Sequence, residues 1–402
     1  MSAEPTPDVL IVGGGPAGMM AGLLLARAGV ETLVLEKHAD FLRDFRGDTV
    51  HPSTMAFLDE MGMLERFLQR PHDKVPDIEA RVAGETIRVA DFTHLPVPAP
   101  FIAMMPQWDF LDFVLDEAQA FPAFHFRRNA EAAEFIDEAG RVVGVKLADG
   151  SIIRASKLVI AADGRRSIAR KILPLKDIGA PMDVFWFSVP KVDDGQNRTV
   201  GVFEAGRILA VLDRSTYWQC AYVFPKGSVE AMKARGLPAI LADIERAAPE
   251  LGPLADVLTS WDHFKLLAVS LDRLETWSRP GLLAIGDAAH AMSPIGGVGI
   301  NLAVQDAVAT ANILAQALLN NANVDDLLVK VQERRLWPTR VIQGFQRVAQ
   351  NNIIGALLQS NARLDRPPLP LRLLKRFPIL QRIPARLLGL GVRHEHVRSP
   401  KA

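Results

Sequence analysis

The sequence predicts a mixed α/β fold with two sheet-containing domains and helices at the C-terminus. A strand, glycine turn, helix and strand open the chain over residues 8–36, and turn-separated strand-like segments dominate residues 182–269. A buried strand at 281–285 and an alanine-rich helix over 301–319 then follow. The 402 residues suffice for two domains with sizeable cores. We therefore expect a parallel-sheet domain that is interrupted by an antiparallel one.

The composition limits the classes of function. With 46 basic and 46 acidic residues the net charge is zero, which argues against nucleic acid as a partner. Cys220 is the only cysteine, so internal disulfides, thiolate-rich metal sites and two-thiol redox centres are excluded, and a cytoplasmic location is favoured. Glu4 and Asp8 precede the first apolar run, unlike a secretory signal, and Arg27 interrupts the longest apolar segment before it could span a membrane.

The first 36 residues predict a strand–helix–strand unit. The run at 8–12 is strand-like, residues 16–28 are rich in helix formers, and 31–36 form the next strand. Such a crossover is right-handed and joins parallel strands, so Gly13 and Glu36 should share the carboxyl edge of the sheet.

In the following segments, the spacing of apolar residues is helix-like in some and strand-like in others. Residues 53–69 and 108–120 carry apolar side chains at helical spacing. Residues 78–89 alternate like strands around a turn, and 141–160 read as a meander that returns to a sheet edge.

We predict a discontinuous first domain and a C-terminal extension. The first domain comprises 1–75, 101–180 and 270–350, the second comprises 76–100 and 181–269, and 351–402 form a basic helical segment. Residues 363–402 hold ten Lys or Arg against two acids. This tail could make peripheral contact with an anionic membrane, but prolines cut it into short helices, which favours docking against the first domain.

A glycine fingerprint stands between the first strand and helix. The segment from Gly13 to Gly18 fits G-x-G-x-x-G, in which Gly13 permits a tight turn and Gly15 lets a diphosphate approach the helix N-terminus. Gly18 allows close helix–strand packing, and Glu36 can accept hydrogen bonds from a ribose. These features predict a Rossmann-like dinucleotide-binding domain, without distinguishing FAD from NAD.

A second motif follows the strand that ends at Ile285. In Gly286-Asp-Ala-Ala-His290, Asp287 can hold sugar or ribityl hydroxyls, whereas His290 packs or forms a hydrogen bond. The loop at 294–301 frees glycine amides at the start of a helix, whose dipole adds about half a positive charge. Such a loop would stabilise an anionic reduced ring.

Taken together, these motifs resemble the single-component (group A) FAD-dependent monooxygenases, the family of para-hydroxybenzoate hydroxylase and the ubiquinone-pathway hydroxylases. The matches are the fingerprint with Glu36, an Asp163-Gly164 pair within 158–167, and the second motif with its glycine loop. The resemblance implies that the Asp-Gly pair serves FAD and the pyridine nucleotide, and that the glycine loop faces the flavin ring. Arg46 and Gln107 are further FAD contacts on this resemblance alone, and each could instead be a solvated loop residue. The predicted cofactor-binding residues are Gly13, Gly15, Pro16, Ala17, Gly18, Glu36, Lys37, Arg46, Gln107, Asp163, Gly164, Gly286, Asp287, Pro294, Gly297, Gly299, Ile300 and Asn301.

The resemblance also implies the reaction. NADH or NADPH, bound transiently because only one fingerprint exists, would reduce FAD, and dioxygen would then form a flavin hydroperoxide that hydroxylates an aromatic or conjugated small molecule. The partners are thus the aromatic substrate, O2 and NAD(P)H, and the protein is a monomer or homodimer. The resemblance weakens over 182–260, so the substrate stays open.

His51 and Tyr222 are the candidate catalytic residues, because each could help the substrate lose a proton. Alternatively, Tyr222 is a packed strand residue, and His51 leads into a helix capped by Ser53. Tyr217 is a weaker candidate.

Two other functions stay open. A flavin-dependent reductase of double bonds would carry the same flavin motifs, whereas a non-catalytic carrier on the same fold would have lost FAD, against which the intact glycines argue. The absence of a Cys-x-x-x-x-Cys pair disfavours a disulfide reductase, and that of a Trp-x-Trp-x-Ile-Pro segment a tryptophan halogenase.

Overall fold

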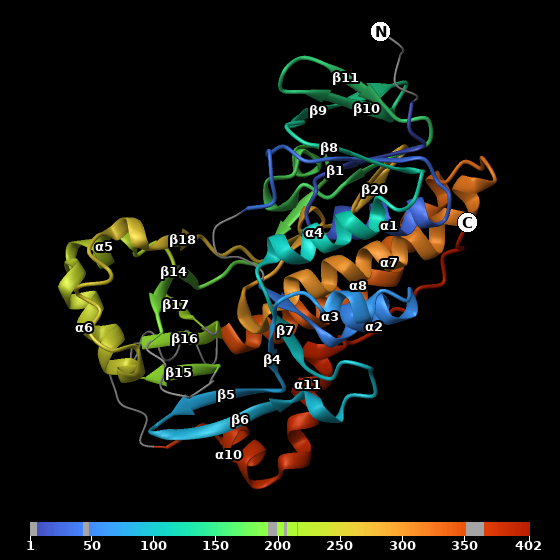
Figure 1. Cartoon of the computed structure of the whole chain (residues 1–402). Coiled ribbons are helices and arrows are strands. Elements are labelled where there is room, and N and C mark those ends of the chain that lie inside the picture. The colour runs from blue at the N-terminus through green and yellow to red at the C-terminus, as the bar shows by residue number, and fades with distance from the viewer. Residues whose placement is uncertain (1–5, 43–47, 192–198, 205–206, 215, 351–365) are drawn as a thin grey trace.

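The computed structural model describes residues 6–42, 48–191, 199–204, 207–214, 216–350 and 366–402. The described residues form two sheet-containing parts, with helices packed below the first sheet and at the far side of the second (Figure 1). This arrangement confirms the predicted mixed α/β fold class.

The first part is built on a six-stranded sheet. Its order is β20 (Ser278–Arg279), β21 (Leu282–Ala284), β12 (Leu158–Ala161), β1 (Val9–Val12), β2 (Thr32–Leu35) and β8 (Phe124–Arg127). All neighbours pair in parallel except β20 with β21. The four residues of β1 are all buried, as expected for a central strand covered on both faces.

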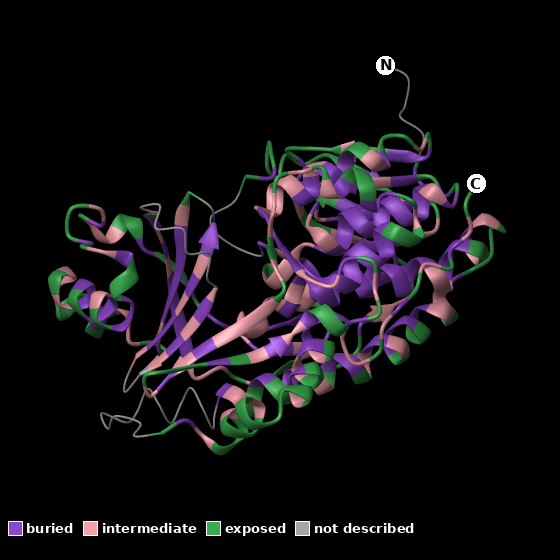
Figure 2. Cartoon of the chain, turned by 60° about the horizontal axis from the view of Figure 1, so that its bottom comes forward, coloured by how far each residue is buried: buried purple, intermediate pink, exposed green. Residues whose placement is uncertain are grey.

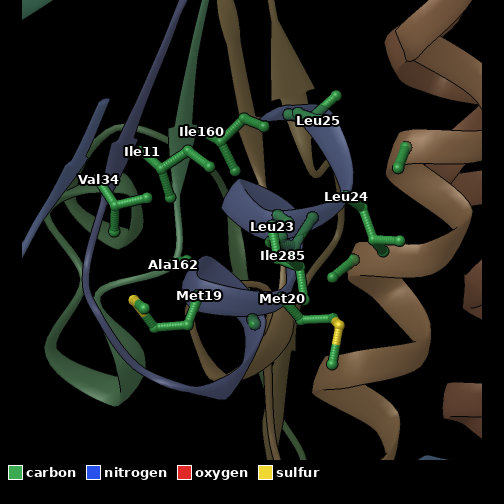
Figure 3. Close-up of a cluster of buried hydrophobic side chains, with 14 of the residues drawn as sticks. Ile11, Met19, Met20, Leu23, Leu24, Leu25, Val34, Ile160, Ala162 and Ile285 are labelled. Atoms are coloured by element: carbon green, nitrogen blue, oxygen red, sulfur yellow. The ribbon is translucent and has the colours of Figure 1, made fainter. Parts of the chain in front are cut away.

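Helices cover this sheet in layers. They are α1 (Pro16–Arg27), α4 (Gln107–Ala118), α7 (Val298–Leu319) and α8 (Asp325–Ala349). Figure 3 shows α1 between the sheet residues Ile11 and Ile160 on one side and α7 on the other, with Leu24 pointing toward α7. One helical stretch, Ile295–Leu319, is long and apolar enough to cross a membrane, but 72% of its most apolar window is buried inside the protein. It is therefore the core helix of this domain.

The second part is a seven-stranded sheet. Its order is β18 (Lys265–Leu267), β14 (Met182–Pro190), β17 (Tyr217–Pro225), β16 (Arg207–Arg214), β15 (Val200–Glu204), β5 (Asp77–Val82) and β6 (Glu85–Asp91). The pairs are antiparallel except β15 with β5, where the excursion of residues 77–91 joins the sheet. Helices α5 (Val229–Ala234) and α6 (Leu237–Ala247) cover one face.

Two local predictions are wrong. Residues 141–160 do not form one meander: β9 (Ala132–Glu138), β10 (Arg141–Leu147) and β11 (Ile152–Arg154) make a separate sheet, and the chain then enters the centre of the main sheet as β12. The single helix expected over 53–69 is split into α2 (Pro52–Glu60) and α3 (Leu64–Leu68), because Gly62 adopts a left-handed φ of 73° between them.

Two small sheets complete the strands of the described residues. One consists of β3 (Thr49–Val50), β7 (Ile102–Met104) and β4 (Asp73–Val75), and the other of β13 (Leu175–Asp177), β19 (Asp272–Leu274) and β22 (His290–Ala291). The second of these contains His290, the last residue of the second motif.

The C-terminal residues contact both parts of the protein. Helices α10 (Leu369–Arg376) and α11 (Arg382–Gly389) lie against β6, and the last residues run back toward α1. Glu395 accepts hydrogen bonds from Arg334 at 2.7 Å and from Arg335 at 3.2 Å, and Arg27 donates to the Ser399 carbonyl. The two helices thus lie against the second sheet, and the last residues dock on the first part of the protein, so the predicted docking on the first domain holds for the last residues alone.

Replacing Leu24 with Ala should destabilise the protein. Leu24 is fully buried between α1 and α7, so the substitution leaves a cavity that costs about 2–5 kcal/mol in the free energy of unfolding. Leu42→Ala, at a side chain that is 60% exposed, is the control and should change this free energy by less than about 0.5 kcal/mol. Denaturant unfolding followed by circular dichroism measures both, and equal effects would contradict the assigned core.

Candidate functional site

The three sequence motifs meet at one edge of the six-stranded sheet. Strand β12 pairs with β1 on one side and with β21 on the other, so Gly13, Asp163 and Gly286 emerge next to each other. A Cβ added to Gly13 would lie 2.4 Å from the Ala162 carbonyl oxygen, and one added to Gly286 would lie 2.8 Å from the Ala17 Cβ. The motifs are therefore in close contact at Gly13 and Gly286, where any larger residue would collide with its neighbours.

The fingerprint combines close contact at two glycines with open space at the third. Gly13 has a φ of 109°, and a Cβ on Gly18 would lie 1.9 Å from the Gly13 carbonyl oxygen. Around Gly15, the N-cap of α1, an added Cβ would meet no atom within 4 Å. Pro16 occupies the first turn, Ala17 is buried, and no acid offsets the positive end of the helix. A diphosphate fits this open, positive position.

Glu36 is fixed beside the fingerprint at the end of β2. Its Oε2 accepts the Gly14 N–H at 3.1 Å, and its Oε1 accepts the His38 N–H at 3.0 Å. The side chain is therefore oriented next to the glycine turn, where a ribose would follow the diphosphate. The adjacent Lys37 is exposed to solvent.

The segment that contains the Asp163-Gly164 pair has two buried polar atoms without hydrogen-bond partners among the described residues. The Asp163 Oδ2 accepts the Ile168 N–H at 2.9 Å, but its Oδ1 has no partner, and burial raises the pKa of this carboxyl group. Arg165 donates from Nε to Asp287 at 3.0 Å and from Nη2 to the Met292 carbonyl at 2.9 Å, while its Nη1 has no partner. Buried polar atoms are nearly always satisfied, so these two fit a bound polar ligand.

The glycine loop turns the chain into α7 at the same edge. Gly296 and Gly297 have φ values of 76° and 63°, and Gly297 is the left-handed N-cap of α7. Gly299 lies beside Asp287, since a Cβ on it would be 4.0 Å from the Asp287 Oδ1. No acid occupies the first turn of this 22-residue helix, so its positive end is available to an anionic ring.

The other predicted residues of these segments take various positions. Pro294 starts the loop in helical conformation, Gly164 has a φ of 80°, and Ile300 is buried in the core. Gln107 begins α4 and donates its backbone N–H to Asp48 at 3.3 Å. Arg46 lies outside the described residues.

Asn301 is engaged within the protein. Its Oδ1 accepts the hydroxyl of Ser53 and, at 3.0 Å, the amide of Gln305, and its Nδ2 donates to the Leu388 carbonyl at 3.1 Å. The side chain therefore joins α2 and α11 to the first turn of α7, directly after the glycine loop.

His51 is a buried neighbour of the glycine loop. It is fully buried, and its Nε2 lies 3.1 Å from the Gly297 carbonyl oxygen, to which it donates in the neutral state. Burial lowers the pKa of His51 to about 4, although the carbonyls of Gly297 and Leu388 act in the opposite direction. At neutral pH this ring is uncharged and fixed to the loop backbone.

Tyr222 points away from the glycine loop. On β17 it lies in the core formed with Phe185 and with Ile240 and Ile244 of α6, while its neighbour Ala221 belongs to the opposite face. Burial raises the pKa of the Tyr222 phenol, with a further contribution from Asp243. This position on the helix-covered face does not support the predicted catalytic role.

Two buried charge networks were not found from the sequence. Asp306 on α7 lies 2.6 Å from the His290 Nε2 and 3.0 Å from the Arg335 Nε, and it accepts the Gly286 N–H at 3.1 Å. Burial acts to raise the pKa of Asp306, but His290 and Arg335 lower it overall. The network fixes the turn that carries Asp287. A carboxylate on the buried face of an alanine-rich helix is the sequence signal that could have indicated it.

The second network joins the two parts of the protein. Arg214 at the end of β16 forms a buried ion pair with Asp48 at 2.6 Å and donates to Gln219 at 2.9 Å. Asp48 in turn accepts the Gln107 N–H. The pair therefore links the second sheet to the start of α4, and no local pattern in the sequence marks it.

Comparisons with known proteins agree with this geometry. A family model described as an FAD binding domain matches residues 6–344. The 6-methylpretetramide 4-monooxygenase of Streptomyces rimosus is 34% identical over 351 residues, 83% of each chain. The para-nitrophenol 4-monooxygenase of Pseudomonas sp. (strain WBC-3) is 27% identical over 339 residues, 81% of each chain. The structure of p-nitrophenol 4-monooxygenase PnpA from Pseudomonas putida DLL-E4 superposes with a TM-score of 0.72 at 23% identity, covering 97% of this chain and 100% of that one.

A Rossmann-like domain whose three motifs converge on one sheet edge defines a flavoprotein, and FAD is its cofactor. The chain belongs to the FAD-binding-domain family that includes the single-component FAD-dependent aromatic monooxygenases. The resemblance found from the sequence is thereby confirmed.

A pair of glycine substitutions should separate FAD binding from folding. Gly15→Ala places its methyl group in open space, so we expect unchanged stability of the FAD-free protein but at least tenfold weaker FAD binding, because the methyl occupies the diphosphate position. Gly18→Ala forces its methyl onto the Gly13 carbonyl and should unfold at lower denaturant concentration even without FAD. Flavin fluorescence titration and urea unfolding measure the two effects, and identical behaviour of the variants would refute the assignment.

The buried His51 should make stability depend on pH. The unfolded ring binds a proton near pH 6.5 and the folded ring only near pH 4, so its contribution is complete above pH 6.5 and decreases by about 3 kcal/mol as the pH falls to about 4. His51→Gln should lose this part of the decrease in the free energy of unfolding between neutral and acidic pH. His125→Gln, at an exposed ring, should retain it. Urea unfolding at pH 7.5 and 5.0 tests this, and equal slopes in all three proteins would contradict it.

Proposed function

We propose that this protein is an NAD(P)H-dependent FAD monooxygenase that hydroxylates an aromatic or conjugated small molecule. The observation that carries the proposal is the convergence of the Gly13, Asp163 and Gly286 segments at one sheet edge. Bound FAD supplies the redox chemistry that activates dioxygen. In the overall reaction, substrate, O2, NAD(P)H and a proton give hydroxylated product, water and NAD(P)+.

The residues of the site then have distinct tasks. The open position at Gly15 and the positive end of α1 hold the diphosphate, and Glu36 receives the ribose. Asp287, oriented by Arg165, binds the ribityl hydroxyls. The amides at the start of α7 stabilise negative charge on the reduced ring. His51 positions the loop that carries these amides, and we infer no role in proton transfer for His51.

An apolar face of the second sheet supports an aromatic substrate. Val184, Ala221 and Leu267 form a buried cluster on the face opposite the helices, and Ile295 of the glycine loop packs against the same cluster. Trp186 also packs there, and its Nε1 has no hydrogen-bond partner among the described residues. Such a surface excludes water from the flavin and offers one donor to a substrate oxygen.

The relatives guide the choice of substrate. The relative at 34% identity is named for its action on 6-methylpretetramide, and the one at 27% for its action on para-nitrophenol. We therefore propose a phenolic or related aromatic substrate and rank 6-methylpretetramide before simple nitrophenols. A cytoplasmic location and a monomeric or homodimeric state remain predictions.

Oxygen consumption tests the proposed reaction. The FAD-loaded full chain is mixed with NADH or NADPH and a panel containing 6-methylpretetramide, nitrophenols and hydroxy-heteroaromatic acids. A true substrate should accelerate both NAD(P)H oxidation and O2 uptake at least tenfold, and the product should gain one oxygen atom by mass spectrometry. Anaerobic conversion to a product with two added hydrogens would instead establish a reductase. A colourless protein that cannot be reconstituted with FAD would establish a carrier.

A further inference from the structure

The C-terminal helices expose a set of large apolar side chains. We call them the C-terminal apolar patch, which lies on α10, on the following 3-10 turn Pro378–Gln381 and on α11. Figure 1 shows α10 below β6 and α11 beside it, and Figure 2 turns the lower side of the protein forward. The patch consists of Leu369, Leu373, Phe377, Ile379 and Ile383, which are 42–66% exposed.

The exposure does not result from loose attachment of α11. Ala385 and Leu388 on the inner side of α11 are buried in a core with Phe92 and Leu95. Gly389 is so close to Leu95 that an added Cβ would lie 2.7 Å from its side chain. The inner side of α11 is thus packed against the protein, while the apolar side chains of the patch remain exposed among the described residues.

Basic side chains surround the patch. Residues 367–392 contain five of them and no Asp or Glu, although the whole chain has a net charge of zero. The five are Arg372, Lys375, Arg376, Arg382 and Arg386, all exposed. Among the described residues, Lys375 has an acidic partner in Glu85, at 2.8 Å. The surface therefore combines unburied apolar groups with a local excess of positive charge.

This combination selects the occupant. A second copy of the chain joined by two-fold symmetry would place the same patch against itself, and five positive charges would face five others. An anionic lipid surface accepts both features, since apolar side chains enter the boundary of the acyl chains while Arg and Lys remain among the phosphates. We propose that the C-terminal apolar patch binds the surface of membranes that contain anionic lipids.

The geometry of the helices fits binding in the plane of the membrane. Leu369 and Leu373 are one turn apart on α10, and Arg372 and Arg376 flank them. Each helix has only eight residues, too few to span a bilayer but sufficient to lie along its surface. The inner side of α11 remains packed against Phe92 and Leu95, so this packing and membrane binding use opposite faces of the segment.

Vesicle sedimentation tests the proposal with the FAD-loaded full chain. We expect at least tenfold stronger binding to vesicles of phosphatidylcholine with 30 mol% phosphatidylglycerol, roughly the anionic content that supports such contacts, than to phosphatidylcholine alone, and weakening in high salt. Ile379→Ser with Ile383→Ser, and separately Arg376→Glu with Arg382→Glu, should each reduce binding at least tenfold. The matched control is Ile152→Ser with Leu266→Ser, two exposed apolar residues elsewhere, and it should bind like wild type. Flavin absorbance and circular dichroism verify that every variant is folded.

A dye reports directly on insertion. The single native thiol, Cys220, is buried, and its pKa is raised by burial, so Ile379→Cys would be labelled selectively by an environment-sensitive maleimide. The emission should shift to the blue with anionic vesicles, while the same dye at Ile152→Cys should not respond. Equal binding to neutral and anionic vesicles, equal loss in the control variant, or no blue shift at position 379 would overturn the proposal. Binding to a soluble acidic polypeptide without vesicle binding would do so as well.

Discussion

The contact between the backbone of Gly13 and the Ala162–Asp163 segment is the constraint on which the site depends. It brings the turn after β1 so close to the end of β12 that no side chain fits between them. Because β12 also pairs with β21, the same closeness extends to Gly286 and, through it, to the start of α7. One extended cofactor can then be held along its length by three segments that lie far apart in the chain. The second sheet only has to cover this edge.

The parts of the site that the sequence revealed are those with a local backbone requirement. A tight turn before a helix demands glycine at fixed spacing, and the fingerprint and the loop at 294–301 both show it. The Asp163-Gly164 pair has no such local signal and was found by resemblance. The meander over 141–160 was misassigned because adjacent strand-like segments do not show which sheet each one joins. Similarly, successive side chains of β17 alternate between the two faces of the sheet, but the sequence does not show that helices cover the face on which Tyr222 lies.

Interactions between distant side chains could not be predicted from one sequence. Asp306, His290, Arg335 and Glu395 come from four separate segments, and although the position of Asp306 on an apolar helix signals its burial, nothing local identifies its partners. Their burial is tolerable because every charge faces an opposite one, and removing one partner would leave another exposed to a medium of low polarity. The same reasoning applies to Arg214 and Asp48, which connect the two sheets. These pairs determine how rigidly the predicted motifs are held.

The docking of the tail has a consequence for the order of events during synthesis. The residues around Glu395 and Ser399 complete contacts with Arg27, Arg334 and Arg335. On the ribosome, the strand and helix that carry the fingerprint emerge hundreds of residues earlier. The surface that these last residues contact therefore stays uncovered until they have been synthesised. Closure of the nucleotide-binding domain therefore comes after the segment around Glu395 and Ser399 has emerged, and until then the nascent chain is exposed to chaperones and proteases.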